Sequence, residues 1–268
     1  MAIDVCTLTA GSVPLLVSFP HAGTDIPDDI ARRMTPSALA RADTDWHLPT
    51  LYAFVRELGA STLVPRCSRY VIDLNRPPED SNLYPGQDST GLVPLDSFHR
   101  EPLYQSGRAP DAAEAAARLG AYWQPYHAAL RGELARLRAA HGVALLWDAH
   151  SIASVLPRFF DGKLPDLNLG SADGHSCAAA PQAAVEAVLR SQTLFTHVSN
   201  GRFKGGYITR AYGQPAEGVH ALQMEICHST YMDEAPPFTY RPELAARVQP
   251  LLRRMLEAAL DSVVKARA

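Results

Sequence analysis

Three apolar, β-prone runs in this chain lead directly to histidine or carboxylate side chains, and this pattern constrains the fold most. One run leads to His21, a second leads to Asp148 and His150, and a third ends at Glu225. In open α/β sheets, ligands bind beyond the carboxyl ends of the strands. We therefore expect these four side chains to meet at one rim of a sheet, as the start of a metal site.

Strand-like and helix-like segments alternate along the sequence. Strands are predicted at residues 13–19, 62–65, 68–73, about 143–148, 194–199 and 222–225, and helices at 36–41, 48–58, 110–140, 180–190, about 215–219 and 241–266. This alternation predicts one α/β domain over residues 1–268, a three-layer α/β/α sandwich with a mixed, mostly parallel sheet. Residues 77–108 are rich in Pro, Gly, Asp and Ser, which predicts a long functional loop.

The composition is that of an ordinary globular protein, with 47% hydrophobic and 20% charged residues. Lys and Arg number 25 against 28 Asp and Glu, a net charge of −3, which offers no basic surface for nucleic acid or an anionic membrane. We find no secretion leader and no apolar run approaching ~20 residues, so a cytoplasmic protein is expected. The expected partner is a small molecule, and nothing indicates an oligomeric state.

Two histidines are the first candidate metal ligands. His21 lies at a strand-to-loop junction before small residues, which leaves room for an ion beside its ring. Asp148 and His150 are two apart on one strand and therefore share a face. Asp148 either holds the second imidazole nitrogen of a ligand histidine or acts on the reacting group directly, and the sequence leaves both roles open.

The third metal ligand is expected to be an aspartate, because a catalytic zinc usually takes three protein ligands and leaves one position for water. Asp45, shortly before the 48–58 helix, is the preferred candidate. Asp25, in the loop after His21, is the alternative. Asp43 and Asp45 also suit a purely structural role as helix N-caps.

Glu225 ends an apolar strand, where a buried carboxylate is costly unless it pairs, binds metal or serves as a general base. The Cys227–His228 pair that follows suggests a rival, a thiol nucleophile with its base. Adjacent residues on a strand point to opposite faces, so this pair is poorly placed to cooperate. The four cysteines of the chain form no C-x-x-C pair, and we expect buried, reduced thiols rather than a structural zinc site.

Two arginines are candidates for substrate recognition. Asn75 and Arg76 stand together after the predicted 68–73 strand. Arg210 lies in a predicted glycine-rich loop, residues 205–213, within the glycine- and arginine-bearing segment 201–213. The forked donors of a guanidinium match a planar carboxylate, so two arginines in one pocket would suit a dicarboxylate. The alternative is that both are solvated surface side chains.

Taken in order, these motifs resemble the N-formylglutamate amidohydrolase (N-formylglutamate deformylase) family. The matching segments are 18–23 (SFPHAG), 43–47 (DTDWH), 69–76 (RYVIDLNR), 147–151 (WDAHS), 205–210 (GGYITR) and 223–225 (QME). Together they extend over nearly the whole chain. The family is also similar, more remotely, to zinc carboxypeptidases and aspartoacylases, which implies a phosphorylase/hydrolase-like, zinc-carboxypeptidase-like fold.

The resemblance implies specific roles for the candidate residues. His21 and His150 would bind the metal, Asn75 and Arg76 would hold a substrate carboxylate, and Glu225 would activate water. One position departs from the carboxypeptidase pattern, which has Glu three residues after the first His, whereas this chain has Thr24. The third ligand is therefore expected to come from elsewhere in the chain.

The implied activity is hydrolysis of N-formyl-L-glutamate to formate and L-glutamate, the closing step of one histidine-degradation route. The implied cofactor is one divalent metal ion, zinc before cobalt, manganese or iron, since mixed His and carboxylate ligation suits all of them. The first rival is a metal-dependent amidohydrolase of another N-acyl amino acid, acetyl or formimino, because one methylene is worth only ~1–3 kcal/mol of discrimination. The second rival is a non-catalytic binding relic.

Overall fold

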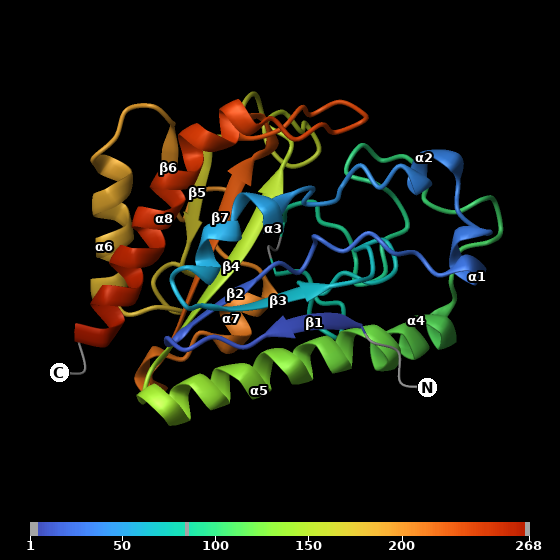
Figure 1. The fold of residues 1–268 in the computed structure, drawn as a ribbon. Coiled ribbons are helices and arrows are strands. Elements are labelled where there is room, and N and C mark those ends of the chain that lie inside the picture. The colour runs from blue at the N-terminus through green and yellow to red at the C-terminus, as the bar shows by residue number, and fades with distance from the viewer. Residues whose placement is uncertain (1–4, 84–85, 266–268) are drawn as a thin grey trace.

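The computed structural model describes residues 5–83 and 86–265, and its strands form one seven-stranded sheet (Figure 1). The strand order is β1-β3-β2-β4-β7-β5-β6. Their bounds are β1 Cys6–Thr9, β2 Leu15–Ser18, β3 Ser61–Pro65, β4 Ala144–Ile152, β5 Leu167–Gly170, β6 His197–Ser199 and β7 Val219–Cys227. Only the β1–β3 and β5–β7 pairs are antiparallel. The predicted mixed, mostly parallel sheet is confirmed.

Helices cover both faces of this sheet. Two of them, α6 (Ala179–Arg190) and α8 (Pro242–Lys265), pack together on one face, and α5 (Gln124–His141) lies along the other (Figure 1). Strands β2, β4 and β7 are buried at every position, as expected for parallel strands covered on both faces. The predicted three-layer α/β/α sandwich is therefore confirmed.

Neighbouring strand residues belong to two different cores. Leu145 and Trp147 of β4 pack with the buried residues of α8, whereas Ala144 and Leu146 pack with those of α5. This alternation follows from the two-residue period of a strand, and it explains why the central strands are apolar throughout rather than at every second position.

The predicted 110–140 helix exists but is not uniform. It consists of α4 (Ala112–Arg118), a π turn (Leu119–Trp123) and α5. The π turn stands just before Pro125, whose ring would clash with a carbonyl of the preceding helical turn. The wider turn accommodates that proline without ending the helix.

Four shorter predictions were wrong or incomplete. The 48–58 helix is split into α3 (Leu48–Leu51) and a 3-10 turn (Ala53–Arg56), and the fully buried Tyr52 stands at the break. Residues 68–73 form turns rather than a strand; Tyr70 and Val71 pack in a separate small core, and Ile72 packs in the core beneath α5. The 201–213 segment contains the helix α7 (Tyr207–Tyr212), and the helix expected at 215–219 is a 3-10 turn, Pro215–Glu217.

Other elements agree with their predicted places, apart from their ends. The helix α2 covers Pro36–Leu39, and α8 ends the described part of the chain, so the last residue of the predicted 241–266 helix lies outside it. Four short elements were not predicted, namely β1, β5 and α1 (Asp28–Ala31), each of four residues, and the 3-10 turn η4 (His228–Thr230). In the described residues, no helix combines the length and the apolar character that a membrane crossing requires.

Candidate active site

The register of the central strands brings the predicted residues to one end of the sheet. Strands β2, β4 and β7 are parallel neighbours, and His150 is the direct partner of Glu225. Both strands continue two residues beyond these side chains, to Ile152 and Cys227, so each strand extends farther along the chain than predicted. His21 lies in the turn after β2, where the backbone N–H of Asp45 donates to its carbonyl oxygen at 3.1 Å.

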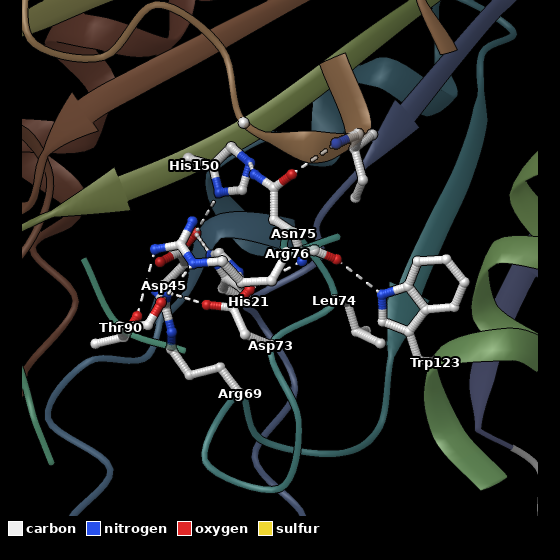
Figure 2. Close-up of polar contacts among 12 residues, drawn as sticks. His21, Asp45, Arg69, Asp73, Leu74, Asn75, Arg76, Thr90, Trp123 and His150 are labelled. Carbon is white, nitrogen blue, oxygen red and sulfur yellow. Dashed lines mark hydrogen bonds and ion pairs between the residues drawn. The ribbon is translucent and has the colours of Figure 1, made fainter. Parts of the chain in front are cut away.

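Three buried side chains form a cluster suited to a metal ion (Figure 2). A carboxylate oxygen of Asp45 lies 3.8 Å from Nδ1 of His21 and 3.4 Å from Nδ1 of His150. One ligand atom from each residue falls within 4.8 Å of the others. Asp25, the alternative third ligand, is exposed instead and pairs with Arg66 at 3.4 Å. The carboxylate that meets the two imidazoles is therefore that of Asp45.

The chemistry of this cluster fits a divalent cation. Both carboxylate oxygens of Asp45 are buried and have no hydrogen-bond partner among the described residues, which is costly for a charged group. Burial and the nearby Arg69 lower the pKa of His21, which favours the neutral imidazole that a metal ligand requires. Burial alone would lower the pKa of His150, but Asp148 and Asp45 raise it well above its usual value. The carboxylates of Asp45 and Asp148 therefore make the surroundings of His150 favourable for a positive charge.

Two further aspartates hold the outer nitrogens of the histidine rings. Nε2 of His21 lies 2.7 Å from Asp73, and Nε2 of His150 lies 3.0 Å from Asp148. A carboxylate beside one ring nitrogen is typical of a metal-binding histidine, whose other ring nitrogen faces the ion. This geometry favours the role in which Asp148 orients the ring of His150 over the role in which it acts directly on the reacting group. Asp73 was not recognised as a separate site residue, although it lies within the 69–76 motif.

Glu225 lies beside the cluster in a buried position, with a relative exposure of 7%. Burial raises its pKa to about 8, and the negative charges of Asp45 and Asp148 act in the same direction, against the opposing effect of His150 and Arg69. A carboxyl group that titrates near neutral pH can both accept and return a proton. This position is consistent with the predicted role as general base.

The cluster opens into a cleft whose described lining includes His21, His150 and Glu225. Three arginines line it, namely Arg69, Arg76 and Arg202. Arg76 donates from Nε to the carbonyl oxygen of Thr90 at 2.8 Å (Figure 2). The predicted Arg210 lies instead on α7, donates to the carbonyl oxygen of Gly205 at 2.8 Å, and is absent from the described lining of the cleft.

Asn75 is fixed between the cluster and α7. Its Nδ2 lies 3.0 Å from Nε2 of His150, and its Oδ1 accepts from the backbone N–H of Ile208 at 2.8 Å. Gly206 packs directly against it, since a Cβ added there would lie 2.3 Å from Nδ2 of Asn75. The glycine-bearing motif is therefore required for the close approach of α7 to this amide.

Gly206→Ala is expected to lower kcat/KM by roughly 10²-fold, the cost of an ångström-scale displacement at a site. The added methyl group must push Asn75 away from its present place. Gly132→Ala is the matched control, because nothing lies within 4 Å of a Cβ at that exposed helical position. Steady-state kinetics would measure both variants, and wild-type kcat/KM in Gly206→Ala would show that Asn75 needs no such support.

The rival Cys227–His228 pair is poorly suited to nucleophilic catalysis. The Cys227 thiol faces the carbonyl oxygens of Leu164 and Pro165 at 3.6 and 3.4 Å. Burial, with nearby negative charge, raises its pKa, which disfavours the thiolate. Neither residue is among those found lining the cleft.

The chain is similar in sequence to a known enzyme family. The N-formylglutamate amidohydrolase family model matches residues 13–232. The N-formylglutamate deformylases of Pseudomonas aeruginosa and Pseudomonas putida are 51% and 50% identical over 257 and 256 residues, which is 96% of this chain and 96% of each relative.

Solved structures show the same fold. A crystal structure of N-formylglutamate amidohydrolase from Ralstonia eutropha JMP134 superposes with a TM-score of 0.81 at 27% identity, over 99% of both chains. A structure from Agrobacterium tumefaciens, with a TM-score of 0.72 at 21% identity over 97% of this chain and 96% of that one, supports the fold alone. With the family model covering most of its length and two relatives at half identity, the chain belongs to the N-formylglutamate amidohydrolase family.

Proposed function

We propose that this chain hydrolyses N-formyl-L-glutamate to formate and L-glutamate, using one divalent metal ion held by His21, Asp45 and His150. The observation that carries the proposal is the buried carboxylate of Asp45, which has no hydrogen-bond partner among the described residues and faces two imidazole nitrogens beside Glu225. The names and close similarity of the two Pseudomonas relatives support the choice of substrate.

The protein side chains have separate tasks in this reaction. A bound divalent ion supplies Lewis-acid polarisation and lowers the pKa of water. Glu225 takes a proton from the water that attacks the formyl carbon, and it delivers that proton to the nitrogen of glutamate as the C–N bond breaks. Asp73 and Asp148 keep the two histidine rings oriented. Asn75 and Arg76 hold a carboxylate, so the formyl group is presented in one orientation.

Zinc is the proposed ion, because two imidazoles and one carboxylate leave an open position in a catalytic zinc site. Cobalt, manganese and iron are accepted by the same ligands. The proposed biological role is the closing step of a histidine-degradation route, in which N-formyl-L-glutamate is the substrate. This role rests on the family resemblance and on the relatives' activity.

Formate release from N-formyl-L-glutamate tests the proposal directly. Protein stripped by a chelator is expected to lose activity, and reloading with single divalent ions is expected to restore it together with about one bound ion per chain. N-acetyl-L-glutamate serves as the comparison substrate. Faster release of acetate than of formate would identify the chain as an amidohydrolase of another N-acyl amino acid, and full activity without any bound ion would contradict the metal assignment.

A further inference from the structure

Arg202 lies on the segment between β6 and α7 and lines the cleft together with Arg76. Its Nε donates to the carbonyl oxygen of Phe159 at 2.7 Å, and its Nη2 donates to that of Asp88 at 3.4 Å. The guanidinium also lies 5.9 Å from the ring centroid of Phe159 and 5.2 Å from that of Phe203. Backbone oxygens and two aromatic rings thus hold this side chain in a defined place at the cleft wall.

The charges of the cleft favour an anionic ligand. Asp88 and Glu225 are the acidic side chains found in its described lining, beside three arginines. Asp88 already pairs with Arg158 at 3.2 Å and with Arg100 at 2.5 Å. Of the three arginines, Arg69 is paired with the buried Asp73 at 2.6 Å. Arg76 and Arg202 also line the cleft, and the forked donors of a guanidinium match the carboxylates of a ligand.

The two arginines are attached to different parts of the cleft. Arg76 directly follows Asn75, whose Nδ2 lies 3.0 Å from Nε2 of His150. Arg202 is anchored instead to the aromatic wall formed with Phe159. In an N-formyl dicarboxylic amino acid, the α-carboxylate is near the formamide, and the second carboxylate lies farther away along the methylene chain. Arg76 therefore matches the near carboxylate.

We propose that Arg202, and not Arg210, binds the distal carboxylate and makes the site selective for N-formyl dicarboxylic amino acids over neutral ones. The inference rests on the proposed deformylase function, which it deepens by naming the residue that selects the substrate. Phe159, Phe203 and Ile152 also line the cleft, and the methylenes between the two carboxylates would lie against these apolar side chains. Apolar contact in the middle and cationic groups at each end match a short dicarboxylate.

The test compares N-formyl-L-glutamate with N-formyl-L-glutamine, which differ only in the charge of the distal group. In metal-loaded Arg202→Met, kcat/KM for the glutamate substrate is expected to fall roughly 10- to 150-fold, the loss of hydrogen bonds to a charged group. The value for the glutamine substrate is expected to stay within about threefold. Arg202→Lys should recover part of the preference, since it keeps the charge without the fork.

Lys204→Met is the matched control, because this cation lies two residues along the same segment and pairs with Asp173 at 3.1 Å, away from the described cleft lining. It is expected to keep the wild-type preference. An equal loss on both substrates in Arg202→Met would show a structural role only. A preference that survives in Arg202→Met but disappears in Arg210→Met would overturn the assignment in favour of Arg210.

A binding measurement separates this inference from the proposed function. Calorimetry with the product L-glutamate, and with L-glutamine as its neutral counterpart, needs no turnover. If Arg202→Met binds L-glutamate more weakly than the wild type does but binds L-glutamine equally well, the inference is supported. This holds even if the wild type releases no formate, a result that would contradict only the proposed reaction. Formate release by the wild type with unchanged binding and preference in Arg202→Met would overturn only the inference.

Discussion

Glu225→Gln is expected to reduce kcat by roughly 10²–10⁴-fold, the usual contribution of general acid–base catalysis. The substitution keeps the size of the side chain and removes the atom that accepts the proton. Metal content and KM are expected to change little, because Glu225 is not among the three clustered ligand residues. Formate release together with the bound-metal stoichiometry would measure both effects.

The pH profile provides a second readout for Glu225. A general base acts only when deprotonated, so the wild-type kcat/KM is expected to rise with pH as Glu225 loses its proton. That rise is expected to vanish in Glu225→Gln. Glu217→Gln is a suitable control, because Glu217 is an exposed residue just before the opposite end of β7. Near-normal turnover with an unchanged pH profile would remove Glu225 from the mechanism.

The central residues of the site were predictable because of strand geometry. His150 and Glu225 follow apolar runs that could only be buried central strands, and parallel strands place their carboxyl ends at one edge. Asp148 shares a face with His150 for the same reason. Their positions did not depend on any loop, so the sequence pattern alone was sufficient to bring them together.

The loop-borne residues could not be placed in the same way. Asp25 follows His21 by 4 residues and Asp45 follows it by 24, yet the fold brings the more distant Asp45 to the imidazoles. Arg210 was proposed from its glycine-rich segment, and the structure places it on α7, outside the described lining of the cleft. Asp73 was hidden for a related reason, since 68–73 was expected to be a strand and forms turns. Periodicity carries no information about such segments.

Asp45→Asn is expected to weaken metal binding by at least about 100-fold. Loss of a residue that merely hydrogen-bonds to a metal ligand already lowers metal affinity about 10- to 100-fold in typical cases. An amide keeps the shape of the side chain but lacks the negative charge that a divalent cation requires. A 100-fold loss of affinity corresponds to ~2.7 kcal/mol of metal-dependent stabilisation when metal is in large excess. The difference in Tm between loaded and stripped protein is therefore expected to shrink strongly in this variant.

Asp25→Asn is the matched control, since the exposed Asp25 pairs with Arg66 and lies outside the His21, Asp45 and His150 cluster. It is expected to keep both the wild-type metal affinity and the full metal-dependent rise in Tm. Stripped and loaded samples of each variant separate a lost ligand from a general loss of stability, because only the former removes the difference between them. Loss of the metal in Asp25→Asn but not in Asp45→Asn would contradict the assignment of Asp45 as the third ligand. The loop that carries Asp25 would then have to rearrange to reach the two histidines.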